Sequence, residues 1–156
     1  MKNLESLSTG GAALPTTLEA AAGGRRLVCE LVALDRLGCS FDRLALISDE
    51  LAGASMERLK KISEKLVTRI TYLLEPLAPI ELDEDSAVVQ LRSHPPHREE
   101  DRRTYYELHV RRGGEIALCR YEKQNGSSRR RVPAHVTREV LSRLAADLAA
   151  ALDHVE

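Results

Sequence analysis

The chain has 156 residues, of which 43% are hydrophobic and 30% charged, and its formal net charge is −1. This composition is typical of one globular domain and excludes disordered and membrane-spanning classes of protein. The three cysteines show no paired spacing, which favours reduced thiols in the cytoplasm over a disulfide framework. We therefore expect a cytoplasmic protein with a flexible tail over residues 1–14 and a single domain over residues 15–156.

The segment after the tail has the periodicity of a helix. Thr16 and Glu19 fit a capping box at the start of this helix. Leucines recur at helical spacing as far as Leu37, and Gly38 is a typical stop. The pair Gly23-Gly24 weakens the middle of the predicted helix, because glycine lowers helix stability.

Two further helices are expected before residue 76, and they could also form one bent helix. Ser40 can cap the first, which ends near Gly53, and Ser55 can cap the second. The second helix has an apolar stripe: Leu59, Ile62, Leu66, Ile70, Leu73 and Leu77. This stripe is long enough to serve both a core and a partner, so we expect a homodimer through the helix 56–75.

From Pro79 onward the apolar residues recur with a period of two, which is typical of strands. Alternation over residues 80–82 and 87–91 predicts two strands, and the acidic run at residues 83–86 predicts the turn between them. Two prolines and six charged residues indicate an exposed loop over residues 94–103.

A hairpin is predicted around Gly113-Gly114, which is a signal for a two-residue turn. With this turn, Leu108 lies opposite Cys119 and Tyr106 lies opposite Tyr121. One face of the hairpin is then apolar or aromatic and can be buried, whereas a slip of one residue would expose those side chains.

A second hairpin is predicted at Asn125-Gly126, where Arg120 faces Arg131. Pro133 ends the last strand, and a C-terminal helix begins by Thr137. The fold class is therefore α+β. We expect N-terminal helices, an antiparallel meander of about five strands, and a C-terminal helix that packs on the sheet.

A candidate surface for a partner or a nucleic acid follows from these registers. It comprises Arg111, Arg112, Ile116, Leu118, Arg120, Arg129, Arg130 and Arg131. Clustered arginines can bind phosphates, and arginines beside exposed aliphatic residues are typical of protein interfaces. The same pattern is also expected of a solvated face with ion pairs to Glu107 and Glu122, or of a face on which a helix covers the aliphatic residues.

Catalytic, cofactor and metal motifs are not recognisable in the sequence. His94 and His97 lack the further ligands of a zinc site, and the acidic residues 83–85 lack the spacing of a calcium loop. The sequence has no nucleophile elbow, phosphate-binding loop or dinucleotide fingerprint. An enzyme without a local signature is accordingly the third interpretation.

We interpret the protein as a small cytoplasmic binding or assembly module without catalysis, whose partner is another protein or a second copy. No membrane partner is expected. A nucleic-acid-binding accessory domain is the alternative. It ranks second because the acidic segment 81–101 can neutralise the basic strands that follow it.

Overall fold

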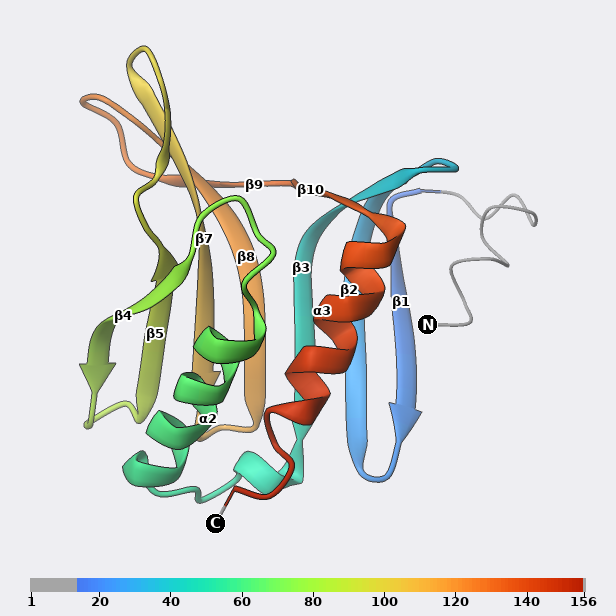
Figure 1. Cartoon of the computed structure of the whole chain (residues 1–156), viewed down its shortest axis with the longest axis vertical. Helices are drawn as coiled ribbons and strands as arrows, with labels where there is room; N and C mark the ends of the chain where they lie inside the picture. The colour runs from blue at the N-terminus through green and yellow to red at the C-terminus, as the bar shows by residue number, and fades with distance from the viewer. Residues whose placement is uncertain (1–13, 156) are drawn as a thin grey trace.

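The computed structural model describes residues 14–155 and consists mainly of one antiparallel sheet (Figure 1). Its strands are β1 (Thr16–Ala22), β2 (Arg25–Leu34), β3 (Gly38–Ser48), β4 (Leu77–Asp83), β5 (Val88–Ser93), β6 (His97–Glu99), β7 (Arg102–Arg111), β8 (Glu115–Gln124), β9 (Arg130–Val132) and β10 (Ala134–Thr137). The main path has the order β1-β2-β3-β8-β7-β5-β4. The three short strands pair beside it: β6 with β7, β9 with β8, and β10 with β3.

Two helices, α2 (Met56–Arg69) and α3 (Arg138–Ala150), lie on the same face of the sheet. A short 3-10 helix, η1 (Asp49–Leu51), leads from β3 toward α2. Helix α2 contacts β4, β5 and β7, whereas α3 contacts β3 and β10. The other face of the sheet has no helix over it among the described residues (Figure 1). The α+β class is thus confirmed, although sheet predominates and the structure has ten strands rather than about five.

The N-terminal segment forms three strands, so the prediction of two helices before residue 53 was wrong. Gly23 and Gly24 form the turn between β1 and β2, with φ values of 60° and 79° that glycine adopts without strain. Two positive φ values in a two-residue loop are typical of a hairpin turn. The residue predicted to cap a helix, Ser40, lies within β3.

The two remaining helices were predicted correctly, together with the capping residue Ser55. The Ser55 hydroxyl accepts a hydrogen bond from the backbone N–H of Arg58 at 3.1 Å, which begins α2. Thr137 caps α3 in the same way, accepting from the N–H of Val140 at 3.1 Å. Helix α3 packs on the sheet as expected, and α2 ends at Arg69, earlier than its apolar pattern suggests.

The apolar stripe of α2 is buried against the sheet. Leu59, Ile62 and Leu66 are fully buried, and Ile70 is 1% exposed. The intramolecular core therefore uses the surface through which a homodimer was expected. Self-association of this chain needs a different surface.

The register of the hairpin β7–β8 differs by one residue from the prediction. Arg112, Gly113 and Gly114 form a three-residue loop, so Leu108 lies opposite Leu118 rather than Cys119. Gly114 has a φ of 112°, and a glycine with positive φ in the last loop position is typical of such hairpins.

The corrected register changes which side chains face the helices. Tyr106 lies opposite Arg120, and Cys119 lies opposite Glu107 on the open face. The hairpin β8–β9 is also shifted by one residue, because Arg120 faces Val132 instead of Arg131.

The predicted exposed loop over residues 94–103 contains the short strand β6, which pairs with the start of β7. The predicted flexible tail falls on residues 1–13, which lie outside the described part of the chain, and on Leu14. No helix within residues 14–155 is long and apolar enough to cross a lipid bilayer.

Candidate functional site

The residues of the candidate surface are divided between the two faces of the sheet. Ile116 and Leu118 are fully buried on the face covered by the helices, where they are part of the core. Arg120 lies on the same face and is 8% exposed, with its guanidinium 4.5 Å from the ring centre of Tyr106. These three residues therefore do not form a surface with the remaining arginines.

Two more of the predicted residues have intramolecular partners at the margins of the sheet. Arg112 donates from Nε to the carbonyl oxygen of Ala54 at 2.6 Å, which ties the β7–β8 turn to the segment before α2. Arg130 donates from Nη2 to the buried carboxylate of Glu122 at 3.0 Å. Both guanidinium groups thus stabilise local structure.

The open face holds the other three arginines of the candidate surface. Arg131 lies opposite Tyr121 in the β8–β9 register, and Arg129 stacks its guanidinium 4.1 Å from the ring centre of Tyr121. Arg111 belongs to the same face because it alternates with the inward Val110 along β7. This face is therefore basic only over the part formed by β7, β8 and the segment before β9.

Glu107 is the centre of a polar network on the open face, and it is 1% exposed. Its Oε1 accepts hydrogen bonds from Gln90 Nε2 at 2.6 Å and from His109 Nε2 at 3.0 Å. Its Oε2 accepts from Arg92 Nη2 at 2.8 Å and from Arg129. Burial alone would raise the pKa of Glu107, but these donors outweigh burial and lower the pKa to about 2.

Two stacked tyrosines extend this network along the sheet. The rings of Tyr105 and Tyr121 are 6.1 Å apart between centroids, with 28° between their planes. Arg92 lies over Tyr105 at 4.5 Å from the ring centre, and Arg129 lies over Tyr121. The guanidinium groups that bind Glu107 therefore also cover the aromatic rings.

The consequence for nucleic-acid binding is that three of these arginines, Arg92, Arg129 and Arg130, already have anionic partners. A phosphate would have to compete with the buried carboxylates of Glu107 and Glu122 for Arg129 and Arg130. Ion pairs to these two carboxylates were one of the expectations from the sequence. The predicted register of the β7–β8 hairpin, however, placed Arg120 on the wrong face of the sheet.

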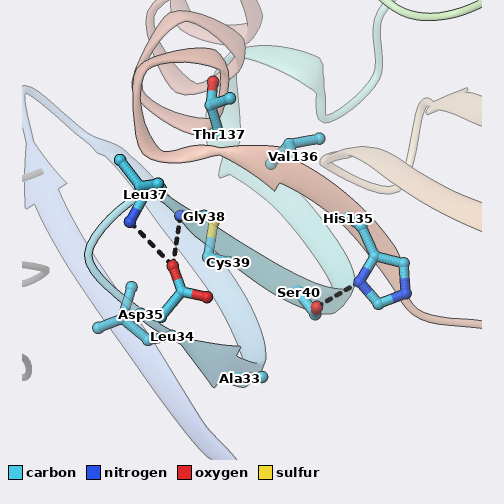
Figure 2. Close-up of a pocket in the computed structure, with 10 residues that line it drawn as sticks. All are labelled: Ala33, Leu34, Asp35, Leu37, Gly38, Cys39, Ser40, His135, Val136 and Thr137. Carbon is cyan, nitrogen blue, oxygen red and sulfur yellow. Dashed lines mark hydrogen bonds between the residues drawn. The ribbon is translucent and has the colours of Figure 1, made fainter.

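A cleft of about 530 Å³ lies between the β2–β3 turn and β10 (Figure 2). The Ser40 hydroxyl and His135 Nδ1 are 2.6 Å apart at one end of this cleft. The carboxylate of Asp35 accepts from the N–H groups of Leu37 and Gly38, each at 2.8 Å, on the side of the cleft away from His135 (Figure 2). The hydroxyl and imidazole therefore link β3 to β10, and within residues 14–155 no carboxylate is hydrogen-bonded to this histidine.

The residues that were considered as metal ligands in the sequence make other contacts in the structure. His97 Nε2 contacts the carboxylate of Glu99 at 3.3 Å, and Asp83 Oδ1 accepts from the N–H groups of Asp85 and Ser86. Within the described residues, no three His, Cys, Asp or Glu side chains are grouped as metal ligands.

The edge strand β1 is a feature that sequence analysis missed, because the segment was interpreted as a helix. All seven residues pair with β2 in one continuous register. Glu19 is the only charged residue of the strand, and Ala20, Ala21 and Ala22 are exposed. The signal available in the sequence is Gly23-Gly24 after two β-branched threonines, which is typical of a strand followed by a hairpin turn.

The opposite edge, β4, has the features by which native sheets avoid pairing with other chains. Pro79 cannot donate a backbone hydrogen bond, and the register with β5 shifts between Pro79 and Glu81. Glu81 and Asp83 add negative charge to the exposed strand. Proline, a bulge and charged residues all disfavour edge-to-edge association. Strand β1 has neither a proline nor a bulge, and Glu19 is its one charged residue.

Comparison of the chain with known family models, characterised proteins and solved structures finds no match. A function therefore has to be argued from the surfaces and contacts described above.

Proposed function

We propose that the protein is a non-catalytic binding and assembly module that holds an extended segment of a protein partner as an additional strand on β1. The observation that supports this proposal is the difference between the two edges of the sheet. Among residues 14–155, strand Thr16–Ala22 pairs with β2 alone and presents a regular row of backbone groups with a single charge, whereas β4 has a proline, a bulge and two acidic residues.

Strand addition follows from the chemistry of such an edge. The outer N–H and C=O groups of an edge strand are hydrogen-bonding groups that a second extended chain can satisfy. The small side chains of Ala20, Ala21 and Ala22 let another backbone approach closely. Main-chain hydrogen bonds would provide the affinity. The few larger side chains, Leu18 and Glu19, would determine the register in which the added strand pairs.

Nucleic-acid binding remains the alternative proposal, and the contacts of the arginines disfavour it. Arg92 and Arg129 bind Glu107, and Arg130 binds Glu122. Binding of a phosphate backbone would leave these carboxylates buried without their partners, which is costly.

The experiment that tests strand addition uses a photo-crosslinking amino acid at Ala21 and, as the matched control, at Ala78. Both alanines belong to edge strands and face the open side of the sheet. After irradiation in an extract of the native organism, we expect protein adducts from position 21 and none from position 78. The crosslinked partner is then purified with the unmodified chain, and hydrogen exchange of the β1 amides is measured.

Slower exchange of the β1 amides in the purified complex supports strand addition. Equal adducts from both positions, or unchanged exchange in β1, would contradict it. A complex that dissociates steeply with salt and contains RNA or DNA would favour the nucleic-acid alternative.

A further inference from the structure

Strand β1 can pair with β1 of a second copy of the chain, and its register with β2 determines which residues would then be neighbours. Two copies related by a two-fold axis perpendicular to the sheet would pair their β1 strands antiparallel, with their helices on the same face. In this arrangement, directly opposite side chains lie on the same face of the sheet. The axis must therefore lie between the two copies of one residue, so that this residue is opposite itself. The central positions of the strand that can hold the axis are Leu18, Glu19 and Ala20.

Charge excludes the first two of these registers. An axis at Glu19 places this carboxylate directly opposite the same carboxylate of the second copy, which is destabilising. An axis at Leu18 places Glu19 opposite Thr17 of the second copy. Because Thr17 lies opposite Glu30 in the β1–β2 register, that row would again bring two acidic residues toward each other.

An axis at Ala20 gives the opposite result. Glu19 then lies opposite Ala21 of the second copy, and Ala21 lies opposite Arg26. Across the joined strands, Glu19 of one copy and Arg26 of the other therefore lie on either side of Ala21. The two-fold axis repeats this arrangement. Within one chain, Arg26 Nη1 is already 3.5 Å from Glu19 Oε1, so each charge would lie between two opposite charges.

On this basis we propose that the strand held on β1 is β1 of a second copy of the chain, antiparallel and centred on Ala20. The inference rests on the proposed strand addition and names its partner. The two main sheets become one continuous sheet with all four helices on one face. Five residues of each chain, 18–22, lie opposite one another, and the buried α2 stripe takes no part.

The contact is small, so we expect the dimer to form with increasing protein concentration rather than to be permanent. Light scattering over a range of concentrations measures this equilibrium. Its midpoint provides the dissociation constant that is compared among the variants below.

Single cysteine variants test the register. In Ala20→Cys the two new thiols lie opposite each other, with Cα atoms about 4.5–5.5 Å apart, which is within the range of a disulfide. The matched control Leu18→Cys places its two thiols four residues out of register, about 13 Å apart. Both variants are made with Cys29→Ala, because Cys29 lies directly opposite Leu18 in the β1–β2 register and could form a disulfide within one chain. Cys39 and Cys119 are buried.

Under mild oxidation we expect Ala20→Cys to give a disulfide-linked dimer and Leu18→Cys to remain monomeric on a non-reducing gel. Crosslinking of Leu18→Cys instead would overturn the register. If neither variant crosslinks and light scattering reports a monomer at high concentration, self-pairing is wrong. Adducts of Ala21 with a different protein would then still support strand addition.

Charge reversal is a second test that does not depend on disulfide formation. Glu19→Lys and Arg26→Glu should each weaken the dimer roughly fivefold, and the double variant should restore it, because the row regains opposite charges. A register centred on Leu18 predicts that Glu19→Lys strengthens the dimer through Glu30 and that Arg26→Glu has no effect. That pattern would overturn the proposal.

Discussion

Ala21 of β1 and Ala78 of β4 hold matching positions at the two edges of the sheet, because each lies directly opposite an arginine of the adjacent strand. For Ala78 this arginine is Arg92, which binds the buried Glu107. For Ala21 it is Arg26, whose side chain and that of its partner Glu19 are both about half exposed. The arginine at the β4 edge thus binds a buried carboxylate, whereas the arginine at the β1 edge binds a half-exposed one.

The first prediction follows from this pair of alanines. Ala21→Glu places a carboxylate directly opposite Glu19 of the second copy in the proposed register, so we expect association to weaken about fivefold. Ala78→Glu, which also puts a carboxylate opposite an arginine of its own chain, is the matched control and should leave association unchanged. Sedimentation of both variants over a concentration series measures the difference. An equal loss in both would indicate a general effect of charge rather than pairing at β1.

The second prediction concerns Glu107. Glu107→Gln removes the charge that Arg92 and Arg129 share, and we expect the free energy of unfolding to fall by about 2–3 kcal/mol. The control Glu99→Gln alters an ion pair with Arg102 in which both side chains are about half exposed, and should leave the free energy of unfolding nearly unchanged. Urea unfolding of the three proteins at neutral pH measures both values.

The same carboxylate gives a pH dependence. The pKa of Glu107 is about 2 in the folded protein and near 4.5 when unfolded, so ionisation stabilises the fold by about 3 kcal/mol above pH 4.5. This contribution is lost as the pH falls from about 4.5 toward 2. Glu107→Gln should therefore lose less stability than the wild type over this interval. Parallel slopes of unfolding free energy against pH would contradict the assignment.

The third prediction tests the loop between β7 and β8. A Cβ on Gly114 would be 3.3 Å from the carbonyl oxygen of Ser48, and the φ of 112° disfavours any side chain. Gly114→Ala should therefore cost about 1–2 kcal/mol, whereas Gly113→Ala, with open space around its Cβ and no positive φ, should change stability by less than about 0.5 kcal/mol. A two-residue turn would make both substitutions costly, so equal effects in denaturant unfolding would contradict the register.

The fourth prediction concerns nucleic acid. Because Arg92, Arg129 and Arg130 are paired with carboxylates of the same chain, we expect no measurable binding to generic single-stranded RNA or duplex DNA at physiological salt. If four to six arginines bound phosphates, the log–log dependence on salt would have a slope of about −3 to −5. A tight complex with that slope, lost when Arg129, Arg130 and Arg131 are changed together to Ala, would contradict the prediction.

The sequence predicted those parts of the fold in which a local signal and the tertiary contacts agree. Ser55 caps α2 as expected, α3 begins after Thr137, and the apolar stripe of α2 faces a core. These helices alternate apolar and polar faces clearly, so their period is unambiguous.

The N-terminal strands were missed because their sequence fits both periods. The segment 25–34 contains apolar residues on both faces, so leucines at helical spacing also alternate along a strand. Gly23-Gly24 was the deciding signal, since two adjacent glycines are unfavourable in a helix and favourable in a hairpin turn.

The hairpin register was missed for a related reason. A two-residue and a three-residue loop at Gly113-Gly114 each produce one face of apolar side chains. Only the contact of Leu118 and Ile116 with the helices, which local pairing does not reveal, decides between them. The edge at β1 could not be recognised until the segment was known to be a strand.

The pairing of β3 with β8 determines the order in which the sheet can form. It joins residues 44–47 to residues 115–118, which are separated by much of the chain. The meander β1–β3 leaves a ribosome long before β8 is made, so its strand β3 has no neighbour on one side during that interval. Long-range pairing of this kind slows folding. The edge of β3 that later pairs with β8 is therefore exposed while the middle of the chain is being synthesised.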